Sequence, residues 1–165
     1  QSLKENYPKV QIVYNPTNVG FSKANNQAAK IARGKFLFIL NPDTILKEQA
    51  INSMFRHIRF NMEMGALGPK VLNPDGSLQY SCRRYPTLWT SLFNRYSIFS
   101  RLFPQNRLTT RYLMLDFEHN ETSPVDWLSG CCLMIPKSVF EAVNGFDENY
   151  FLFHYGFGYA WHYSS

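Results

Sequence analysis

The segment Phe36-Leu-Phe-Ile-Leu-Asn-Pro-Asp-Thr44 decides the fold class of this chain. A strand is expected over Lys35–Leu40, because a short, uninterrupted apolar run is typical of a strand buried on both faces of a sheet. Asn-Pro then ends the strand and places Asp43 just beyond its carboxyl end. Open α/β sheets bind ligands at that edge, where a carboxylate can hold Mg²⁺ or Mn²⁺. The alternative is that Asp43 only caps the next helix or fixes the turn.

The sequence on either side of this strand alternates between helical and extended patterns. Helices are expected over 1–7, Phe21–Ala32, Leu46–Phe60 and 136–143, and further strands over Val10–Tyr14, 67–71 and Val125–Ile135. Turns are expected at 73–76 and 144–147, and Gly34 is the expected C-cap of the second helix. Strands and helices in alternation predict an α/β layered fold with parallel pairing.

Composition limits the class of protein without selecting a function. The 165 residues fit one domain or most of one, and 45% hydrophobic with 16% aromatic residues argue against disorder. The net charge of +5 suits nucleotide diphosphates, anionic lipid or nucleic acid alike. Cys82 and the adjacent pair Cys131-Cys132 form neither a disulfide framework nor a metal-binding spacing, which predicts a reducing compartment. No apolar run approaches the roughly 18 residues of a membrane span.

Residues 18–26, Asn-Val-Gly-Phe-Ser-Lys-Ala-Asn-Asn, form a second candidate site. A glycine-containing turn that opens a helix directs backbone N–H groups toward whatever lies there, which suits an anion or a polar ring. Asn25 and Asn26 can add paired hydrogen bonds from the first helical turns. The alternative is an ordinary loop in which Asn18 or Ser22 caps the helix.

Residues 125–135, Val-Asp-Trp-Leu-Ser-Gly-Cys-Cys-Leu-Met-Ile, form a third candidate site. The indole of Trp127 can stack on a sugar face, and Asp126 can accept hydrogen bonds from sugar hydroxyls. Gly130 permits the close approach of a ligand. The alternative is a core strand in which Trp127 serves only packing.

Taken together and in this order, these segments resemble family 2 glycosyltransferases, most closely the bacterial rhamnosyltransferase-like enzymes of surface polysaccharide synthesis. The resemblance is carried by Asn18-x-Gly-Phe-x-x-Ala-Asn-Asn26, Leu40-Asn-Pro-Asp-Thr44, Tyr112-Leu-Met-Leu-Asp116, Val125-Asp-Trp-Leu-Ser-Gly130 and Gly145-Phe-Asp-Glu148. It implies a GT-A-type α/β fold, with a mixed, mostly parallel sheet flanked by helices. It also implies a partial domain, with a donor and metal half at 1–85, a basic aromatic insertion at 86–124 and an acceptor half at 125–165.

The resemblance implies inverting transfer of a sugar from a dTDP- or UDP-linked donor to a glycan or lipid-linked acceptor. The metal, Mg²⁺ or Mn²⁺, is expected at Asp43. The implied donor-binding residues are Asn18, Gly20, Phe21, Asn25, Asn26, Asn41 and Asp43. The implied acceptor-binding residues are Asp126, Trp127, Gly130, Asp147 and Glu148.

Two departures from the family pattern bear on activity. The family's opening strand-helix-strand is not recognised, so the domain is expected to be incomplete at its N-terminus and poorly stable alone. Tyr155-Gly156 stands where the family has Glu-Asp, and the expected catalytic base position is Gly156, which has no side chain. A general base is worth about 10²–10⁴-fold in rate. The chain is therefore expected to be impaired unless His154 or His162 substitutes.

Residues 88–103 combine apolar residues at helical spacing with surrounding arginines. This pattern fits a helix lying on an anionic membrane surface, and equally a core-packing helix with solvated arginines. The expected location is cytoplasmic, with possible peripheral contact at the inner face of the membrane.

Three other functions are compatible with parts of the sequence. A non-catalytic remnant that binds nucleotide or glycan is favoured by the loss of the Glu-Asp pair. A sugar-nucleotide nucleotidyltransferase shares the architecture, but no glycine-rich basic loop is seen. A nucleic-acid-binding module ranks last, because the arginines lie among aliphatic residues and form no recognised motif, so no nucleic-acid partner is expected.

Overall fold

The computed structural model describes residues 2–61, 63–85, 110, 113–117, 119–149 and 160–163. Its helices are α1 (Ser2–Asn6), α2 (Phe21–Ile31), α3 (Ala50–Phe60) and α7 (Lys137–Ala142). Its strands are β1 (Phe36–Leu40), β2 (Ala66–Pro69), β3 (Val71–Leu72), β4 (Leu78–Gln79), β5 (Cys82–Arg83), β6 (Ser123–Val125), β7 (Trp127–Leu128), β8 (Cys132–Pro136) and β9 (Ala160–Tyr163).

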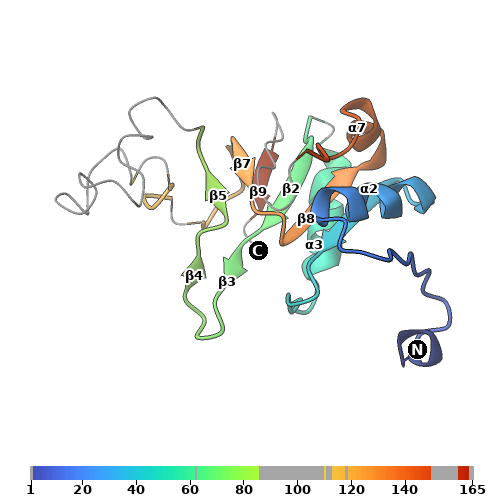
Figure 1. Ribbon diagram of the computed structural model, residues 1–165. Helices are drawn as coiled ribbons and strands as arrows, with labels where there is room; N and C mark the ends of the chain where they lie inside the picture. The colour runs from blue at the N-terminus through green and yellow to red at the C-terminus, as the bar shows by residue number, and fades with distance from the viewer. Residues whose placement is uncertain are drawn as a thin grey trace, which may run out of the picture.

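The main sheet has the strand order β1-β8-β2-β9-β6. Its strands β8, β2 and β9 are labelled in Figure 1. Strand β8 lies between β1 and β2 and runs antiparallel to both, so β1 and β2 point the same way. Strand β9 is parallel to β2, and β6 is antiparallel to β9. The mixed α/β class is confirmed, but the expected parallel pairing is wrong for β1–β8, β2–β8 and β6–β9. For the two pairs that involve β8, the reason is that β8 starts at the end of the sheet where β1 finishes, and therefore has to run back.

Strand β1 is buried on both faces, as the uninterrupted apolar run predicts. Leu37 and Ile39 belong to a core cluster that also contains Leu133 and Ile135 of β8. Apolar residues of α2 pack against this cluster. Phe36 and Phe38 pack against the opposite cluster, formed around α3. Because side chains alternate between the two faces along β1 and β8, these strands contribute residues to two cores, one on each face of the sheet.

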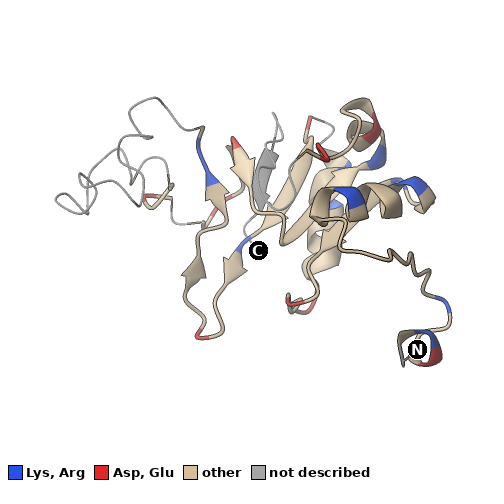
Figure 2. Ribbon diagram, viewed as in Figure 1, with Lys and Arg blue, Asp and Glu red and all other residues tan. Residues whose placement is uncertain are grey.

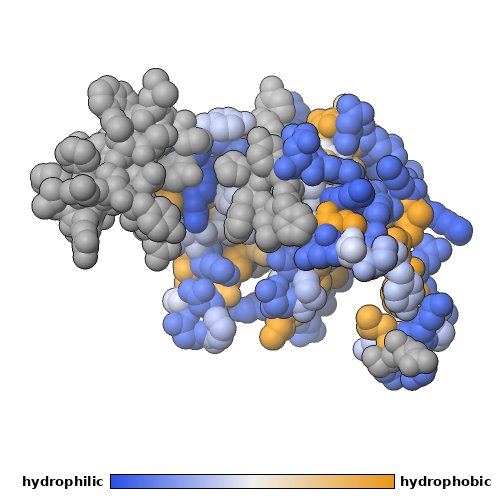
Figure 3. Space-filling view, in the orientation of Figure 1, coloured by the Kyte–Doolittle hydropathy of each residue, from blue (hydrophilic) through white to orange (hydrophobic). Residues whose placement is uncertain are grey.

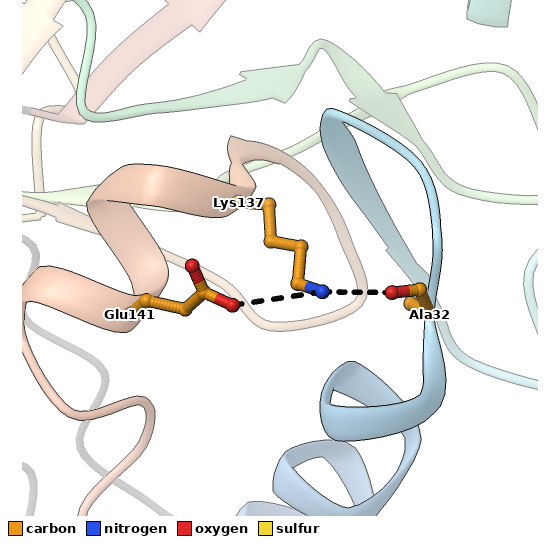
Figure 4. Close-up of polar contacts among 3 residues, drawn as sticks. All are labelled: Ala32, Lys137 and Glu141. Atoms are coloured by element: carbon orange, nitrogen blue, oxygen red, sulfur yellow. Dashed lines mark hydrogen bonds and ion pairs between the residues drawn. The ribbon is translucent and has the colours of Figure 1, made fainter.

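Helix α2 is fastened at its C-terminal end by a side chain of α7. The Lys137 Nζ donates to the carbonyl oxygen of Ala32 at 2.8 Å and forms an ion pair with Glu141 at 3.5 Å (Figure 4). The backbone N–H of Lys137 donates to the Lys35 carbonyl at 2.9 Å. A cation that binds the last carbonyls of a helix satisfies orphan acceptors and complements the helix dipole.

Three predicted elements need correction. Val10–Tyr14 is extended chain and not a strand, because no described strand lies beside it to complete a ladder. The helix predicted from Leu46 begins at Ala50, after Gln49 adopts a left-handed conformation. The single strand predicted over Val125–Ile135 is three strands, β6, β7 and β8, because the chain bends at Asp126 and turns at 129–131.

The remaining predicted helices and strands are found close to where the sequence places them, but the C-cap of α2 is Ala32 and not the expected Gly34. Helices α1, α2 and α7 fall within the predicted ranges, and the segment predicted at 67–71 is divided between β2 and β3. The 73–76 turn joins β3 to β4, with Gly76 at a φ of 85° (Figure 1). Residues 88–103 lie outside the described residues, so the predicted membrane-surface helix stays a prediction.

The described surface is polar for the most part. Hydrophobic residues on the face in Figure 3 form small, separate patches among hydrophilic ones. Figure 2 shows basic segments on helices α2 and α7. The sequences of these helices contain Lys23, Lys30 and Lys137. Among the described residues, no helix combines the length and the apolar character that crossing a bilayer requires.

The burial of Ile135 generates a stability prediction with an internal control. Ile135 is 0% exposed, whereas Ile45 is 94% exposed. Ile135→Ala is expected to lower the free energy of unfolding by about 3 kcal/mol, through lost transfer energy and the cavity left behind. Ile45→Ala is expected to stay within about 0.5 kcal/mol of the parent. Urea denaturation measures both, and equal effects would contradict the two-faced core described above.

His119 generates a second prediction, on pH. Its ring is 1% exposed, and the Phe117 and Tyr80 ring centroids lie 4.5 and 5.9 Å away. Burial, and then the charge of Lys70, lower the pKa of His119 below its ordinary value of 6.5. Protonation therefore favours the unfolded chain. The stability that His119 contributes is complete above the unfolded-state pKa and is lost as pH falls through the lowered folded-state pKa.

Melting temperatures between about pH 8 and pH 5 test this prediction. The parent chain should lose stability as the pH falls, and His119→Gln should show a shallower slope over the same range. Identical slopes for the two proteins would show that another group controls the acid response.

Candidate functional site

Two of the predicted motifs meet where β1 ends and β8 begins. The register pairs Leu40 with Cys132. Beyond that pair, the Cys131 carbonyl accepts hydrogen bonds from the Asn41 backbone N–H at 2.9 Å and from the Thr44 hydroxyl at 3.4 Å. The Asn-Pro-Asp-Thr turn is thus fastened to the 129–131 loop, 87 residues further along the chain.

Asp43 lies in this turn with an exposed carboxylate. The turn is closed by the Thr44 N–H, which donates to the Asn41 carbonyl at 3.2 Å. Within the described ranges, no hydrogen bond or ion pair engages the Asp43 side chain. The structure therefore places a carboxylate at the carboxyl end of a buried strand, as predicted, and leaves it accessible.

The surroundings of Asp43 define which kind of metal binding is possible. Across the part of the chain that is described, no group of three or more His, Cys, Asp or Glu residues is placed to hold a metal ion. Magnesium is usually held by one or two carboxylates together with substrate phosphates and water. An exposed Asp43 fits a cation that arrives with a diphosphate, and the described residues build no closed cage around it.

The predicted donor segment opens helix α2. Gly20 precedes the helix at a φ of 82°, and no side-chain hydrogen bond caps the helix start. The Gly20 N–H donates to the Asn18 Oδ1 at 3.0 Å, which shapes the turn. Asn25 donates to the Phe21 carbonyl of its own helix at 2.9 Å. The glycine turn and the helix start are therefore found as predicted, while Asn18 shapes the turn and does not cap the helix.

Asn26 joins this segment to the turn at 145–148. It is 8% exposed, and its Oδ1 accepts from the Phe146 N–H at 2.9 Å. Its Nδ2 donates to the Phe146 carbonyl at 2.9 Å and to the Glu148 Oε1 at 3.0 Å. Phe146 also packs against the ring of Phe21, with centroids 5.7 Å apart. Two motifs separated by 120 residues are in direct contact.

The predicted acceptor residues lie on β6, β7 and the loop that follows. The Asp126 Oδ2 accepts from the Tyr85 backbone N–H at 2.9 Å, so this carboxylate holds the chain where β5 ends. Trp127 is half-buried and pairs across the ladder with Arg83, whose guanidinium carbon lies 5.9 Å from the indole centroid. Gly130 lies in the turn that leads into β8.

Asp147 and Glu148 are exposed, and the structure gives them different surroundings. The Asp147 Oδ1 accepts from both the backbone N–H and the side-chain amide of Asn149, at 2.9 and 2.8 Å. Glu148 instead contacts Asn26, as described above. His154, Tyr155 and Gly156 lie outside the described residues, and of His162 only the backbone in β9 is described, so the catalytic base stays unassigned.

Some contact residues were not predicted from the sequence. Thr44 and Arg83 belong to this group, as does Ser81, whose carbonyl accepts from the Ser129 N–H at 2.8 Å. The backbone partners carry no side-chain pattern that a sequence can reveal. Arg83 has a signal in principle, since an arginine and a tryptophan often face each other on paired strands.

The buried thiols and a cavity near the N-terminus lie outside this arrangement. Burial raises the pKa of Cys82 to about 11 and that of Cys132 to about 12, so neither is a thiolate nucleophile at neutral pH. A shallow cavity of about 560 Å³ is lined by Lys4, Val10, Gln11, Ile12, Ile31 and Arg33. It adjoins the C-terminal end of α2, whereas the candidate site adjoins the end of β1.

The printed contacts join the motif-bearing segments in two pairs. At the carboxyl end of β1, the Asp43 turn contacts the 129–131 loop through the Cys131 carbonyl. Helix α2, which the short link 32–35 joins to β1, contacts the turn at 145–148 through Asn26.

Comparison with known proteins identifies the family of this chain. The model of glycosyl transferase family 2 matches residues 1–143, and the chain belongs to that family. The family has the GT-A nucleotide-sugar transferase fold, and its members generally use a divalent metal.

Three relatives illustrate the range of the similarity. An N-acetylglucosaminyl-diphospho-decaprenol L-rhamnosyltransferase of Mycobacterium tuberculosis is 31% identical over 93% of this chain and 52% of that protein. The low-salt glycan biosynthesis hexosyltransferase Agl10 of Haloferax volcanii is 26% identical over 83% of this chain and 40% of that protein. The O-antigen biosynthesis protein RfbC of Myxococcus xanthus is 31% identical over 76% of this chain and 9% of that protein. The chain spans about half the length of the mycobacterial relative.

The Asn26 contact generates a prediction about Gly145. Gly145 has a φ of 76°, and a Cβ there would lie 2.5 Å from the Asn26 Oδ1. Gly76 has a φ of 85° with nothing within 4 Å of its Cβ position. Both alanine variants incur the left-handed backbone cost of about 1–2 kcal/mol, and Gly145→Ala adds a steric clash. Urea denaturation should therefore show a larger loss for Gly145→Ala than for Gly76→Ala. Equal losses would contradict the close approach of Asn26.

Proposed function

We propose that this chain is part of the catalytic domain of an inverting glycosyltransferase that moves a sugar from a nucleotide diphosphate donor to a glycan or lipid-linked acceptor. The observation that carries the proposal is the exposed Asp43 carboxylate at the end of β1, in a turn fastened to the 129–131 loop. A leaving diphosphate needs charge stabilisation at a defined place, and this geometry offers one.

On the donor side, Asp43 would hold Mg²⁺ or Mn²⁺ together with the diphosphate. The bound cation supplies neutralisation of the charge that develops on the leaving group. The uncapped start of α2, preceded by the Gly20 turn, supports a role in orienting the anionic part of the donor. The hydrogen bonds of Asn41 and Thr44 to Cys131 would keep the Asp43 turn in place while the donor binds.

On the acceptor side, Trp127 offers a partly accessible aromatic face and Glu148 an exposed carboxylate. An indole ring packs well against the apolar face of a sugar ring, and a carboxylate accepts hydrogen bonds from its hydroxyls. Inversion requires that a base remove the proton of the attacking hydroxyl as the bond to the diphosphate breaks. The family position for that base is expected at Gly156, so we propose that transfer by this chain is slow.

The relatives guide the choice of substrates. The mycobacterial protein is named for L-rhamnosyl transfer to N-acetylglucosaminyl-diphospho-decaprenol. We therefore propose a dTDP- or UDP-linked donor, with a rhamnosyl donor tested first, and a polyprenol-diphosphate-linked acceptor. An acceptor of this kind lies in a membrane, which fits action at the cytoplasmic face with residues 88–103 at the lipid surface.

A substitution at Asp43 tests the proposal. In the complete gene product, Asp43→Asn is expected to lower the rate of nucleotide release about 100-fold, because one charge-stabilising group is lost from the transition state. The assay supplies a rhamnosyl or hexosyl nucleotide, Mg²⁺ or Mn²⁺, and N-acetylglucosaminyl-diphospho-polyprenol.

Asp75→Asn is the matched control. Asp75 is also an exposed aspartate in a turn, where its carboxylate accepts hydrogen bonds from the backbone and hydroxyl of Ser77. It lies in the β3–β4 hairpin, and its variant should keep the parent rate. Parent protein that binds nucleotide and never transfers would favour a non-catalytic binding role, and an unchanged rate in Asp43→Asn would remove Asp43 from the mechanism.

A further inference from the structure

We propose that Asn26 is a positioning residue that orients Glu148 on the acceptor side, and that it does not contact the sugar donor. The inference rests on the proposed function, since it assigns Glu148 to acceptor binding. It changes the role that the sequence motif implies for Asn26, which is donor binding.

The hydrogen bonds of the Asn26 amide are the first argument. A side-chain amide has two N–H donors. The Nδ2 of Asn26 donates to the Phe146 carbonyl at 2.9 Å and to the Glu148 Oε1 at 3.0 Å. Both donors therefore point into the 145–148 turn, and none is left for a nucleotide or sugar. The Oδ1 is also engaged, by the Phe146 N–H at 2.9 Å.

The chain is shaped to allow this contact, which is the second argument. The ideal Cβ position of Gly145 lies only 2.5 Å from the Asn26 Oδ1, a distance that real Cβ atoms essentially never show. Phe146 is clamped from two elements, with the Phe21 and Phe140 ring centroids 5.7 and 5.2 Å away. The turn is thus held against α2 by a buried two-way hydrogen bond and by aromatic packing.

The consequence concerns Glu148, two residues beyond the clamped Phe146. Its side chain is exposed, and among the described residues its hydrogen-bond partner is Asn26, through Oε1. The second carboxylate oxygen is left to accept from a hydroxyl of an incoming sugar. Misplacement of a binding group by about 1 Å can cost about 100-fold in rate. A fixed Glu148 would therefore favour one orientation of the acceptor.

The experiment combines Asn26→Asp, Glu148→Gln and the double variant in the complete gene product. Asn26→Asp keeps the acceptor for the Phe146 N–H but faces Glu148 with a second carboxylate. It is expected to raise the acceptor KM about tenfold, equivalent to about 1.4 kcal/mol. In the double variant the introduced glutamine can donate to the introduced aspartate, so the acceptor KM should return toward that of Glu148→Gln alone.

Nucleotide binding separates this role from donor binding. The dissociation constants of dTDP and UDP with Mg²⁺, measured by calorimetry, should be the same in the parent protein and in all three variants. Asn52→Ala, which removes an exposed asparagine bonded to Gln49, should leave both acceptor KM and nucleotide binding unchanged. Weaker nucleotide binding in Asn26→Asp with an unchanged acceptor KM would overturn the inference and restore a donor role.

A second pair of variants carries the test if Asn26→Asp does not fold by circular dichroism. Glu148→Gln keeps an oxygen that accepts from Asn26, whereas Glu148→Ala does not. The acceptor KM should rise more for Glu148→Ala, and equal values in the parent and both variants would overturn the inference. Parent protein that transfers no sugar defeats the proposed function and this inference with it. An active parent with unaffected variants defeats only the role of Asn26.

Discussion

The antiparallel insertion of β8 between β1 and β2 is the constraint on which the rest of the structure depends. Because each strand presents alternate side chains to opposite faces, β8 contributes Leu133 and Ile135 to one core and Met134 to the other. The same insertion sets the start of β8 beside the end of β1. The loop that precedes one strand and the turn that follows the other therefore have to meet, and they carry two of the family motifs.

Helix α2 is placed by contacts from the C-terminal part of the chain. At its C-terminal end, Lys137 binds the Ala32 carbonyl, and in its middle, Asn26 binds the backbone of Phe146. A buried amide that lacks a hydrogen-bond partner has lost its hydration without compensation. Breaking one of these polar contacts would therefore cost free energy. These contacts join helix α2 to the segment from α7 to Glu148, and so connect the implied donor segment with part of the implied acceptor segment.

The sequence predicted what depends on local pattern and failed where the outcome depends on distant partners. The apolar run ending at Leu40 indicated burial on both faces, and the Asn-Pro pair placed Asp43 beyond it. Alternation indicates which face a residue occupies but not which way its strand runs, so the direction of β8 was not predictable. Val10–Tyr14 has a strand pattern and lacks a partner among the described residues. Asn26 was recognised as important, but its contact 120 residues away was not.

The bond that fastens the Asp43 turn to the 129–131 loop is accepted by a main-chain oxygen, that of Cys131. Every amino acid supplies that oxygen, so this linkage does not itself constrain the residue type at position 131. Because the hydrogen-bond acceptor is a backbone atom, a sequence alignment does not reveal that related chains share this contact. Two related chains that differ at this position can therefore share the same geometry around the carboxylate, and a change that alters the path of the backbone there would matter more than a change of side chain.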